Sequence, residues 1–210
     1  MDGEAGAQTC RAGGRQLRIY GESISGNCLK VKWICDLVGI SYEWIETSVV
    51  AGDTRKPAFL EINPVGQVPA IVFDDGRRLA QSNAIILCLA EGSSLIPTDS
   101  FQRAKMLEWM FWEQYSHEPA IAVARFQVRE LGKSVADLEP RLVERGNAAL
   151  KRLEDVLADG DFLLGDAISL ADVALVAYTR WAGEGGFDLV RYPRVQRWIG
   201  RCEQALNIRD

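Results

Sequence analysis

Residues 63–80 carry the sequence "NPVGQVPAIVFDDGRRLA", which predicts a turn followed by a β-hairpin. The apolar run "AIVF" (70–73) is typical of a short strand, and "RRLA" (77–80) predicts a second one. Between them, "DDG" (74–76) is a turn signal that joins antiparallel strands. This stretch therefore predicts two neighbouring strands, and the segments on either side decide which fold they belong to.

The segments around the hairpin alternate between strand and helix patterns. "LRIY" (17–20) and "SYEWIE" (41–46) are typical of strands, and the helix predicted between them ends at Gly39. A short helix is predicted over 57–62, with a proline at its first position, and another over 81–92. The first half therefore has the predicted order β-α-β-α-β-β-α.

The second half contains helix patterns and no convincing strand. A long apolar periodicity covers 101–131, and Pro119 inside it predicts a kink or a break because proline cannot continue the hydrogen-bond ladder. A second amphipathic helix is predicted over 137–160. The remaining helices are predicted to begin at Ser169 and at Pro193.

The loop-rich segment "GSSLIPTDS" (92–100) separates the two halves. We predict an α/β domain over 17–92, a linker over 93–100 and an all-α domain over 101–210. The first residues, 1–16, have no helix or strand pattern and are expected to form a flexible tail.

Composition excludes several classes of protein. The net charge of −5 and the lack of a basic run argue against nucleic acid as a partner, because phosphate binding requires clustered Lys and Arg. The five cysteines are scattered and form no metal-binding or disulfide pattern, which is typical of a reducing cytosol. No apolar run reaches membrane-spanning length, so we expect no membrane binding. Together with the cysteine pattern, this predicts a cytoplasmic protein without a metal.

Three motifs, in this order, resemble those of the cytosolic glutathione transferases. They are "NPVGQVPAIV" (63–72), "QSNAI" (81–85) and "FLLGDAISLADVAL" (162–175). The resemblance spans about residues 17–204 and implies a thioredoxin-like N-terminal domain followed by an all-helical C-terminal domain. It also implies a glutathione site on the first domain, an apolar co-substrate pocket between the two, and a homodimer.

The segment "SGNCLKV" (25–31) lies where the first strand passes into the first helix. It is most similar to bacterial branches of the family that use Ser or Thr, with Asn two residues later. Ser25 could simply cap the helix. The resemblance instead implies that the Ser25 hydroxyl and the Asn27 side-chain amide donate hydrogen bonds to the glutathione thiolate. The helix N-terminus also favours negative charge, and such surroundings lower a thiol pKa from about 8.5 to about 7 or below.

Cys28 is the competing candidate, since a cysteine near a helix N-terminus can be reactive. Thiol transferases of this family carry their cysteine at the position of Ser25. We therefore expect Cys28 to be a packing residue.

Four further residues are predicted to hold the tripeptide. The Val68–Pro69 bond is a candidate cis peptide. The resemblance implies that the Val68 backbone pairs with the cysteinyl part of glutathione and that Gln67 lies near the glycyl carboxylate. Ser82 is predicted to cap the helix over 81–92, whose N-terminal amides face the γ-glutamyl carboxylate, while Gln81 accepts from the α-amino group.

Met110, Gln114 and His117 are spaced to share one helix face, and this face could line the cleft between the domains. His117 is the sole histidine, so it is either a general base or a buried structural residue. Asp172 stands three residues after Ser169 and predicts a capping box rather than acid-base chemistry.

These observations predict a glutathione transferase that attacks small apolar electrophiles with bound glutathione, which serves as co-substrate. Two alternatives remain open. One is a glutathione-dependent disulfide-bond reductase, which the Ser-x-Asn pattern makes a serious rival, and the other is a non-catalytic binding domain of the same fold.

Overall fold

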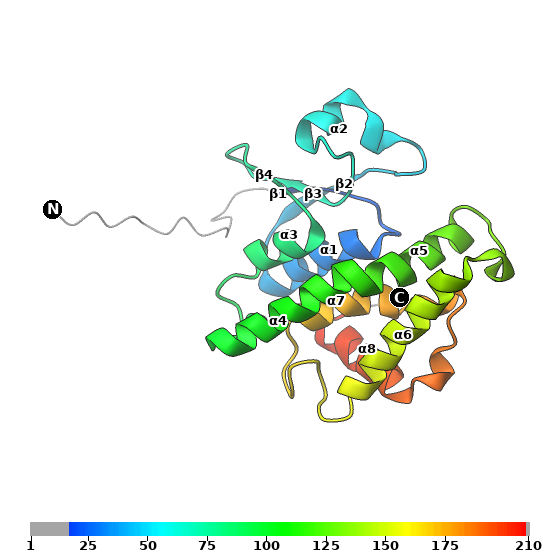
Figure 1. Ribbon diagram of the computed structural model, residues 1–210. Helices are drawn as coiled ribbons and strands as arrows, with labels where there is room; N and C mark the ends of the chain where they lie inside the picture. Colours follow the sequence, from blue (N-terminus) through cyan, green and yellow to red (C-terminus); the bar gives the residue numbers. More distant parts are fainter. Residues whose placement is uncertain (1–16, 209–210) are drawn as a thin grey trace.

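The computed structural model describes residues 17–208, and the tail predicted over 1–16 lies outside the described residues. The N-terminal half forms a four-stranded sheet with the strand order β2-β1-β3-β4. Figure 1 shows this sheet above the helical half of the chain. Its strands are β1 (Leu17–Gly21), β2 (Tyr42–Glu46), β3 (Ala70–Val72) and β4 (Arg78–Ala80).

The pairing of the strands follows their connections. β1 and β2 are parallel because the helix α1 (Gly26–Val38) crosses over between them. β3 pairs antiparallel with both β1 and β4, so the predicted hairpin is confirmed. Gly39 ends α1 with a φ of 73°, a left-handed conformation that suits glycine, as predicted. The peptide bond between Val68 and Pro69 is cis.

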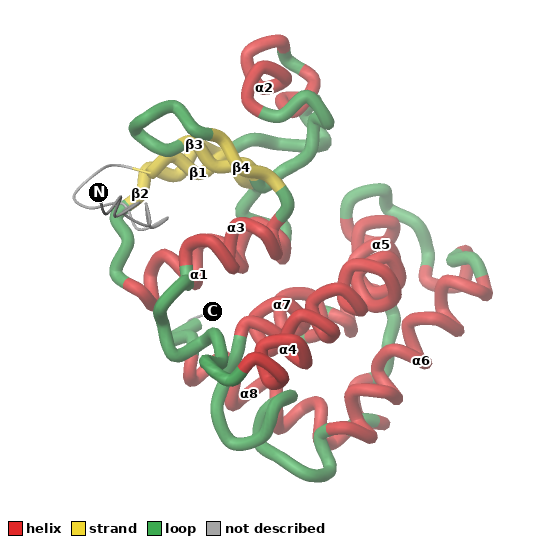
Figure 2. The backbone as a smooth tube through the Cα atoms, turned by 60° about the vertical axis from the view of Figure 1, so that its left-hand side comes forward, coloured by secondary structure: helices red, strands yellow, loops and turns green. Residues whose placement is uncertain are grey.

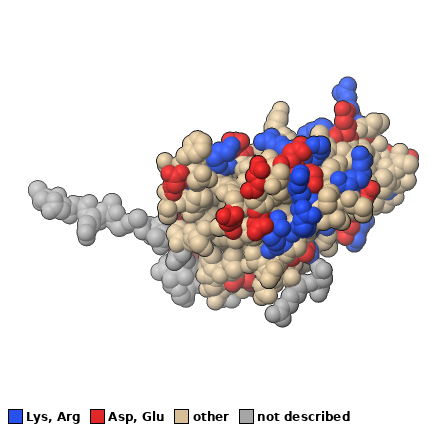
Figure 3. Space-filling view, turned by 90° about the horizontal axis from the view of Figure 1, so that it is seen from below, with Lys and Arg blue, Asp and Glu red and all other residues tan. Residues whose placement is uncertain are grey.

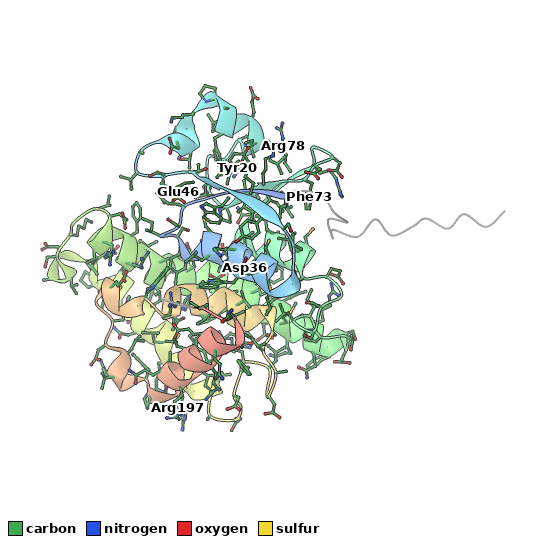
Figure 4. All side chains as sticks on the ribbon, turned by 180° about the vertical axis from the view of Figure 1, so that it is seen from behind. Tyr20, Asp36, Glu46, Phe73, Arg78 and Arg197 are labelled. Carbon is green, nitrogen blue, oxygen red and sulfur yellow. The ribbon has the colours of Figure 1, made fainter. Side chains whose placement is uncertain are left out.

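Helices cover both faces of the sheet. α1 and α3 (Ser82–Leu89) lie on the face toward the helical half, and α2 (Pro57–Ile62) lies on the other face (Figure 1). Figure 4 shows Tyr20 and Arg78 on the side of α2. The Tyr20 ring lies edge-on to the ring of Phe59, with the centroids 6.1 Å apart, and Arg78 donates to the Glu61 carbonyl. These contacts attach α2 to the sheet.

The long apolar periodicity of the second half forms two helices in line. α4 (Ser100–Trp112) and α5 (Glu118–Arg129) are joined by one π-helical turn, η2 (Glu113–His117), and Figure 1 shows them as one long rod. The predicted irregularity is therefore present, but it is a π-helical turn just before Pro119, and the rod does not break at the proline. Proline has no N–H for the carbonyl of Tyr115, and Arg145 donates to that carbonyl instead, at 3.4 Å.

The next helix is shorter than the sequence predicts. α6 runs over Pro140–Val156 rather than over 137–160, because a 3₁₀ turn precedes it and Pro140 takes the first helical position. Gly160 does not end the helix. Its backbone packs against Gly165, where an added Cβ would come within 3.1 Å of a backbone atom.

α7 (Leu170–Thr179) is the centre of the helical half, and all of its residues are buried. The predicted capping box is confirmed, since the Ser169 N–H donates to the Asp172 carboxylate at 2.9 Å. The Trp198 indole N–H of α8 (Pro193–Ala205) donates to the same carboxylate at 2.9 Å. Figure 2 shows α7 enclosed by the other helices.

α1 and α7 touch at the junction of the two halves. An added Cβ on Gly26 would lie 2.7 Å from the Ala177 carbonyl oxygen, so only glycine permits this approach. The N-terminus of α1 is thereby held against the helical half. No helix within residues 17–208 combines the length and apolarity needed to cross a membrane. The remaining short elements are η1 (Asp53–Arg55), η3 (Val135–Asp137), η4 (Ala182–Gly185) and η5 (Leu189–Arg191).

Candidate functional site

A cavity of about 480 Å³ lies between the sheet domain and the helical half. The residues predicted to bind glutathione or its thiolate all line this cavity: Ser25, Asn27, Gln67, Val68, Gln81 and Ser82. Its other wall comes mainly from α5 and α7, namely from Gln114, Glu118, Ala122, Val123, Arg125, Phe126, Glu130 and Tyr178.

Ser25 is the N-cap residue of α1 by its extended backbone, with φ −92° and ψ 119°. Its backbone carbonyl accepts the first hydrogen bonds of the helix, from the N–H groups of Cys28 and Leu29. Its hydroxyl does not cap the helix but lies 3.3 Å from the Tyr178 hydroxyl. The side chain therefore faces the cavity at the positive end of α1.

Tyr178 supports this serine from α7. Burial raises the pKa of its phenol to about 12, while hydrogen bonds with Ser25 and with the Asn27 backbone act in the opposite direction. The phenol therefore keeps its proton at neutral pH. If it donates that proton to the Ser25 oxygen, the Ser25 hydrogen is left for a ligand.

Asn27 lies one residue into α1 and has polar contacts on two sides. Its side-chain oxygen accepts from Lys30 Nζ at 2.8 Å and from the Ser82 hydroxyl at 3.1 Å. Its side-chain nitrogen donates to Glu118 Oε1 at 3.3 Å. Burial raises the pKa of Glu118, and the nearby charge of Glu113 acts in the same direction.

The opposite wall of the cavity is made of loop residues between α2 and α3. The Asn63 side-chain amide donates to the Gln67 carbonyl at 2.8 Å, which holds the loop before the cis bond. Arg55 also lines the cavity and donates to the Val65 carbonyl at 3.4 Å. Its guanidinium group is suited to a carboxylate.

The N-terminus of α3 differs from the prediction, in which Ser82 was the cap residue. Gln81 is the N-cap of α3, and Ser82 is its first helical residue. The Ser82 hydroxyl is therefore used for Asn27 rather than for capping. Gln81 has a φ of 72°, which is rare for a residue with a side chain and is found mostly where a site requires it.

The predicted face of Met110, Gln114 and His117 does not line the cavity as a unit. Gln114 does so, but Met110 and His117 are buried in the helical half and lie outside the lining. The π-helical turn rotates the chain between residues 113 and 117, so the spacing expected for an α-helix does not apply there. His117 Nε2 lies 2.9 Å from the Thr179 hydroxyl oxygen, and burial lowers the His117 pKa to about 4.

Cys28 faces the core behind the cavity. Burial raises its pKa to about 11, although a hydrogen bond with Ser25 opposes this, so the thiol stays protonated at neutral pH. A protonated buried thiol is a weak nucleophile. Among the described residues, no group of three His, Cys, Asp or Glu side chains is arranged to hold a metal ion.

Comparisons with known proteins agree with this geometry. Residues 24–91 match the family model of the glutathione S-transferase N-terminal domain, and residues 123–201 match that of the C-terminal domain. The crystal structure of a glutathione S-transferase from Pseudomonas fluorescens is 44% identical to the chain, with a TM-score of 0.86. The match covers 89% of this chain and 94% of that one.

The chain belongs to the glutathione transferase family. It has the thioredoxin-like N-terminal domain and the all-helical C-terminal domain of that family, as its sequence motifs imply. "Glutathione S-transferase 3" from Zea mays is 32% identical over 167 residues, which cover 74% of this chain and 73% of the relative. "Disulfide-bond oxidoreductase YfcG" from Escherichia coli is 28% identical over 183 residues, which cover 82% of this chain and 83% of the relative.

Sequence reasoning missed several residues that line or adjoin the cavity. Two of them carried a signal: Lys30 lies one helical turn before the buried Ile34, and Glu113 follows Met110 in an apolar stripe. A charged residue on a buried helix face is unusual and normally has a partner. The other three, Arg55, Glu118 and Tyr178, carry no comparable local signal, because only the fold brings them to the cavity.

Proposed function

We propose that the chain is a glutathione transferase, which binds glutathione in the cavity and uses its thiolate to attack a small apolar electrophile. The observation that carries the proposal is the Ser25 hydroxyl, which faces the cavity at the N-terminus of α1 beside the amide of Asn27. Family membership supports the same activity. We also propose that the protein is a cytoplasmic homodimer.

In this proposal the sheet domain holds the tripeptide. The Val68 backbone pairs with the cysteinyl residue, and the N-terminal amides of α3 at Ser82 hold the γ-glutamyl carboxylate. Gln81 accepts from the α-amino group. Gln67 lies near the glycyl carboxylate, and Arg55 adds the positive charge that Gln67 lacks.

The thiol of bound glutathione then loses its proton to solvent. The thiolate accepts hydrogen bonds from the Ser25 hydroxyl and from the Asn27 side-chain amide, and both bonds favour the charged form of the sulfur. The sulfur forms a bond to the electrophilic carbon, and a leaving group departs with its bonding electrons. On the α5 side of the cavity, Ala122, Val123 and Phe126 provide apolar surface, which suits an apolar electrophile.

Replacing the hydroxyl tests the role of Ser25. In Ser25→Ala, the pKa of the bound thiol should rise, and the pH dependence of kcat/KM for a chloronitrobenzene should shift to higher pH. Ser23→Ala is the matched control, because Ser23 is exposed and bonds to Glu46 rather than lining the cavity. An unchanged pH profile in Ser25→Ala would exclude the proposed role.

Disulfide-bond reduction is the second candidate, and the similarity to YfcG favours it. Here the thiolate attacks one sulfur of a disulfide, the other sulfur leaves as a thiolate that takes up a proton, and a mixed disulfide with glutathione forms. The thiolate of a second glutathione attacks the glutathione sulfur of the mixed disulfide. Oxidised glutathione forms, and the remaining half of the substrate leaves as a thiolate that takes up a proton.

Assays of one preparation with a chloronitrobenzene and with a small disulfide separate these reactions. Turnover of the disulfide alone would establish reduction in place of conjugation. A non-catalytic binding domain would turn over neither substrate. If glutathione also fails to raise the melting temperature at millimolar concentration, glutathione binding itself is excluded.

A further inference from the structure

A buried ion pair lies directly behind the cavity. Lys30 Nζ is 2.9 Å from Glu113 Oε1, and both side chains have an exposed fraction of 0%. Within residues 17–208, ion pairs such as Lys32–Asp36 and Lys151–Asp155 are exposed, and Figure 3 shows acidic and basic side chains side by side on the surface. We call the polar group around this pair the Lys30 cluster. Its members are Asn27, Lys30, Ser82, Asn83 and Glu113.

We propose that Lys30, held by Glu113, is a positioning residue that fixes the side-chain amide of Asn27 with its NH₂ group toward the cavity. This inference rests on the proposed function, in which that NH₂ group donates to the glutathione thiolate.

The orientation of the amide follows from the chemistry of its neighbours. A lysine ammonium has only donors, so the Asn27 atom 2.8 Å from Lys30 Nζ must be the oxygen. Ser82 alone could not decide the orientation, because a hydroxyl both donates and accepts. With the oxygen toward Lys30, the nitrogen faces the cavity, where Glu118 takes one N–H at 3.3 Å. The second N–H is then available to a ligand.

Glu113 fixes the position of Lys30 from the helical half. Its Oε1 accepts from Lys30, and its Oε2 accepts from Gln114 at 2.8 Å and from the Asn83 amide at 3.0 Å. Asn83 lies on α3 and Lys30 on α1, whereas Glu113 lies in the π-helical turn. The orientation of Asn27 therefore depends on the docking of the two halves.

The energetics of burial suit a positioning role better than a purely structural one. Burying two charges costs desolvation that their attraction only partly offsets, and apolar residues of similar size often hold two elements together equally well. Apolar residues cannot, however, orient an amide. Of the charged side chains near Asn27, Lys30 and Glu118 contact it directly, and Glu113 acts on it through Lys30.

The double variant Lys30→Met with Glu113→Gln tests the proposal. It removes both charges together, so no unpaired ion is left in the core. Without the ammonium, the Asn27 amide can turn over. We expect the pKa of bound glutathione, measured by the ultraviolet absorbance of the thiolate, to rise by about one unit, with about tenfold less thiolate at low pH. The KM for glutathione should stay near that of the wild type.

Trp198→Phe is the matched control. It removes a buried hydrogen bond to Asp172 at 2.9 Å and lies outside the cavity lining. It should lower the melting temperature without changing the thiol pKa. A rise in the thiol pKa in this control would attribute the effect to lost stability and overturn the positioning role.

Two further variants extend the test, and the first keeps the proposal testable if the double variant does not fold. Asn27→Asp presents only acceptors to the cavity and retains a partner for Lys30, so it should raise the thiol pKa as well. Asn27→Ala added to the double variant should cause no further rise, because Lys30 acts through Asn27. Unchanged thiol pKa in Asn27→Asp, or fully additive effects, would overturn the inference.

The proposed function can fail separately. If the wild-type protein binds glutathione without lowering its thiol pKa, the thiolate mechanism itself is wrong. If the wild type lowers the pKa and the double variant lowers it equally, the mechanism stands and only the positioning role of Lys30 is excluded.

Discussion

Replacing the sole histidine should change how stability depends on pH. His117 Nε2 lies 2.9 Å from the Thr179 oxygen, and the Thr179 hydroxyl already donates to the Leu175 carbonyl at 2.6 Å. Nε2 must therefore carry the ring proton and donate it. Nδ1 is then a buried acceptor with no hydrogen-bond partner among the described residues. A second proton would create a charge inside the helical half.

The pKa values determine the size of the effect. Burial lowers the His117 pKa from its ordinary value of 6.5 to about 4, with Glu113 opposing the shift and Lys30 adding to it. Between these two values the unfolded chain binds a proton that the folded chain does not. The free energy of unfolding therefore falls as the pH falls through this window, by about 1.4 kcal/mol per pH unit and by about 3 kcal/mol in total.

His117→Phe keeps a ring of similar size and removes the titrating group. Urea unfolding of both proteins between about pH 4 and about pH 7 gives the difference in their unfolding free energies. The unfolding free energy of the variant minus that of the wild type should rise by about 3 kcal/mol from neutral to acidic pH, because only the wild type loses the His117 contribution. Burial also raises the pKa values of Glu118 and Asp172, but both proteins contain these groups, so their titrations cancel in the difference.

A difference that does not change with pH would show that His117 titrates normally and would refute the reasoning. The same variant should keep the wild-type pH profile of kcat/KM at neutral pH. A lost ionisation in that profile would instead make His117 a general base.

Further substitutions have separate readouts. Arg55→Ala should raise the KM for glutathione about tenfold through the loss of a carboxylate contact, whereas the neighbouring Lys56→Ala should not, because Lys56 lies outside the cavity lining. Cys28 should react slowly with iodoacetamide at neutral pH because the pKa of its thiol is about 11, and fast labelling would contradict its burial. Cys28→Ser should retain activity. Asp172→Asn should lower the free energy of unfolding by about 1–3 kcal/mol in urea titrations, because an amide cannot replace both acceptor oxygens. Unchanged stability would refute the structural role of Asp172. Phe126→Ala should raise the KM for an apolar electrophile more than the KM for glutathione, and an equal rise in both would contradict its place in the co-substrate wall.

The predictable part of the fold depends on signals between near neighbours in the chain. Such signals correctly predicted the hairpin, the stop at Gly39, an irregularity next to Pro119 and the capping box of Asp172. The predicted range of α6 was wrong at both ends. At the N-terminal end a 3₁₀ turn precedes Pro140. At the C-terminal end Gly160 serves a close backbone approach, which has the same sequence signal as a helix stop.

The candidate site was predictable where a motif carries it. Ser25, Asn27, Gln67, Val68, Gln81 and Ser82 all line one cavity, although their roles toward glutathione stay predictions. The prediction for Met110 and His117 was wrong because the π-helical turn changes which residues share a face. The role expected for Ser82 as a cap was also wrong, since its hydroxyl serves Asn27.

By itself, the sequence determined the order of helices and strands, the family and the N-terminal segments that meet at the cavity. Only the tertiary structure decided which polar groups face one another there. Lys30 and Glu113 are 83 residues apart, and Ser25 and Tyr178 are 153 residues apart. Helix and turn signals depend on backbone hydrogen bonds between near neighbours, whereas these contacts exist only after the two halves have packed and water has been excluded between them.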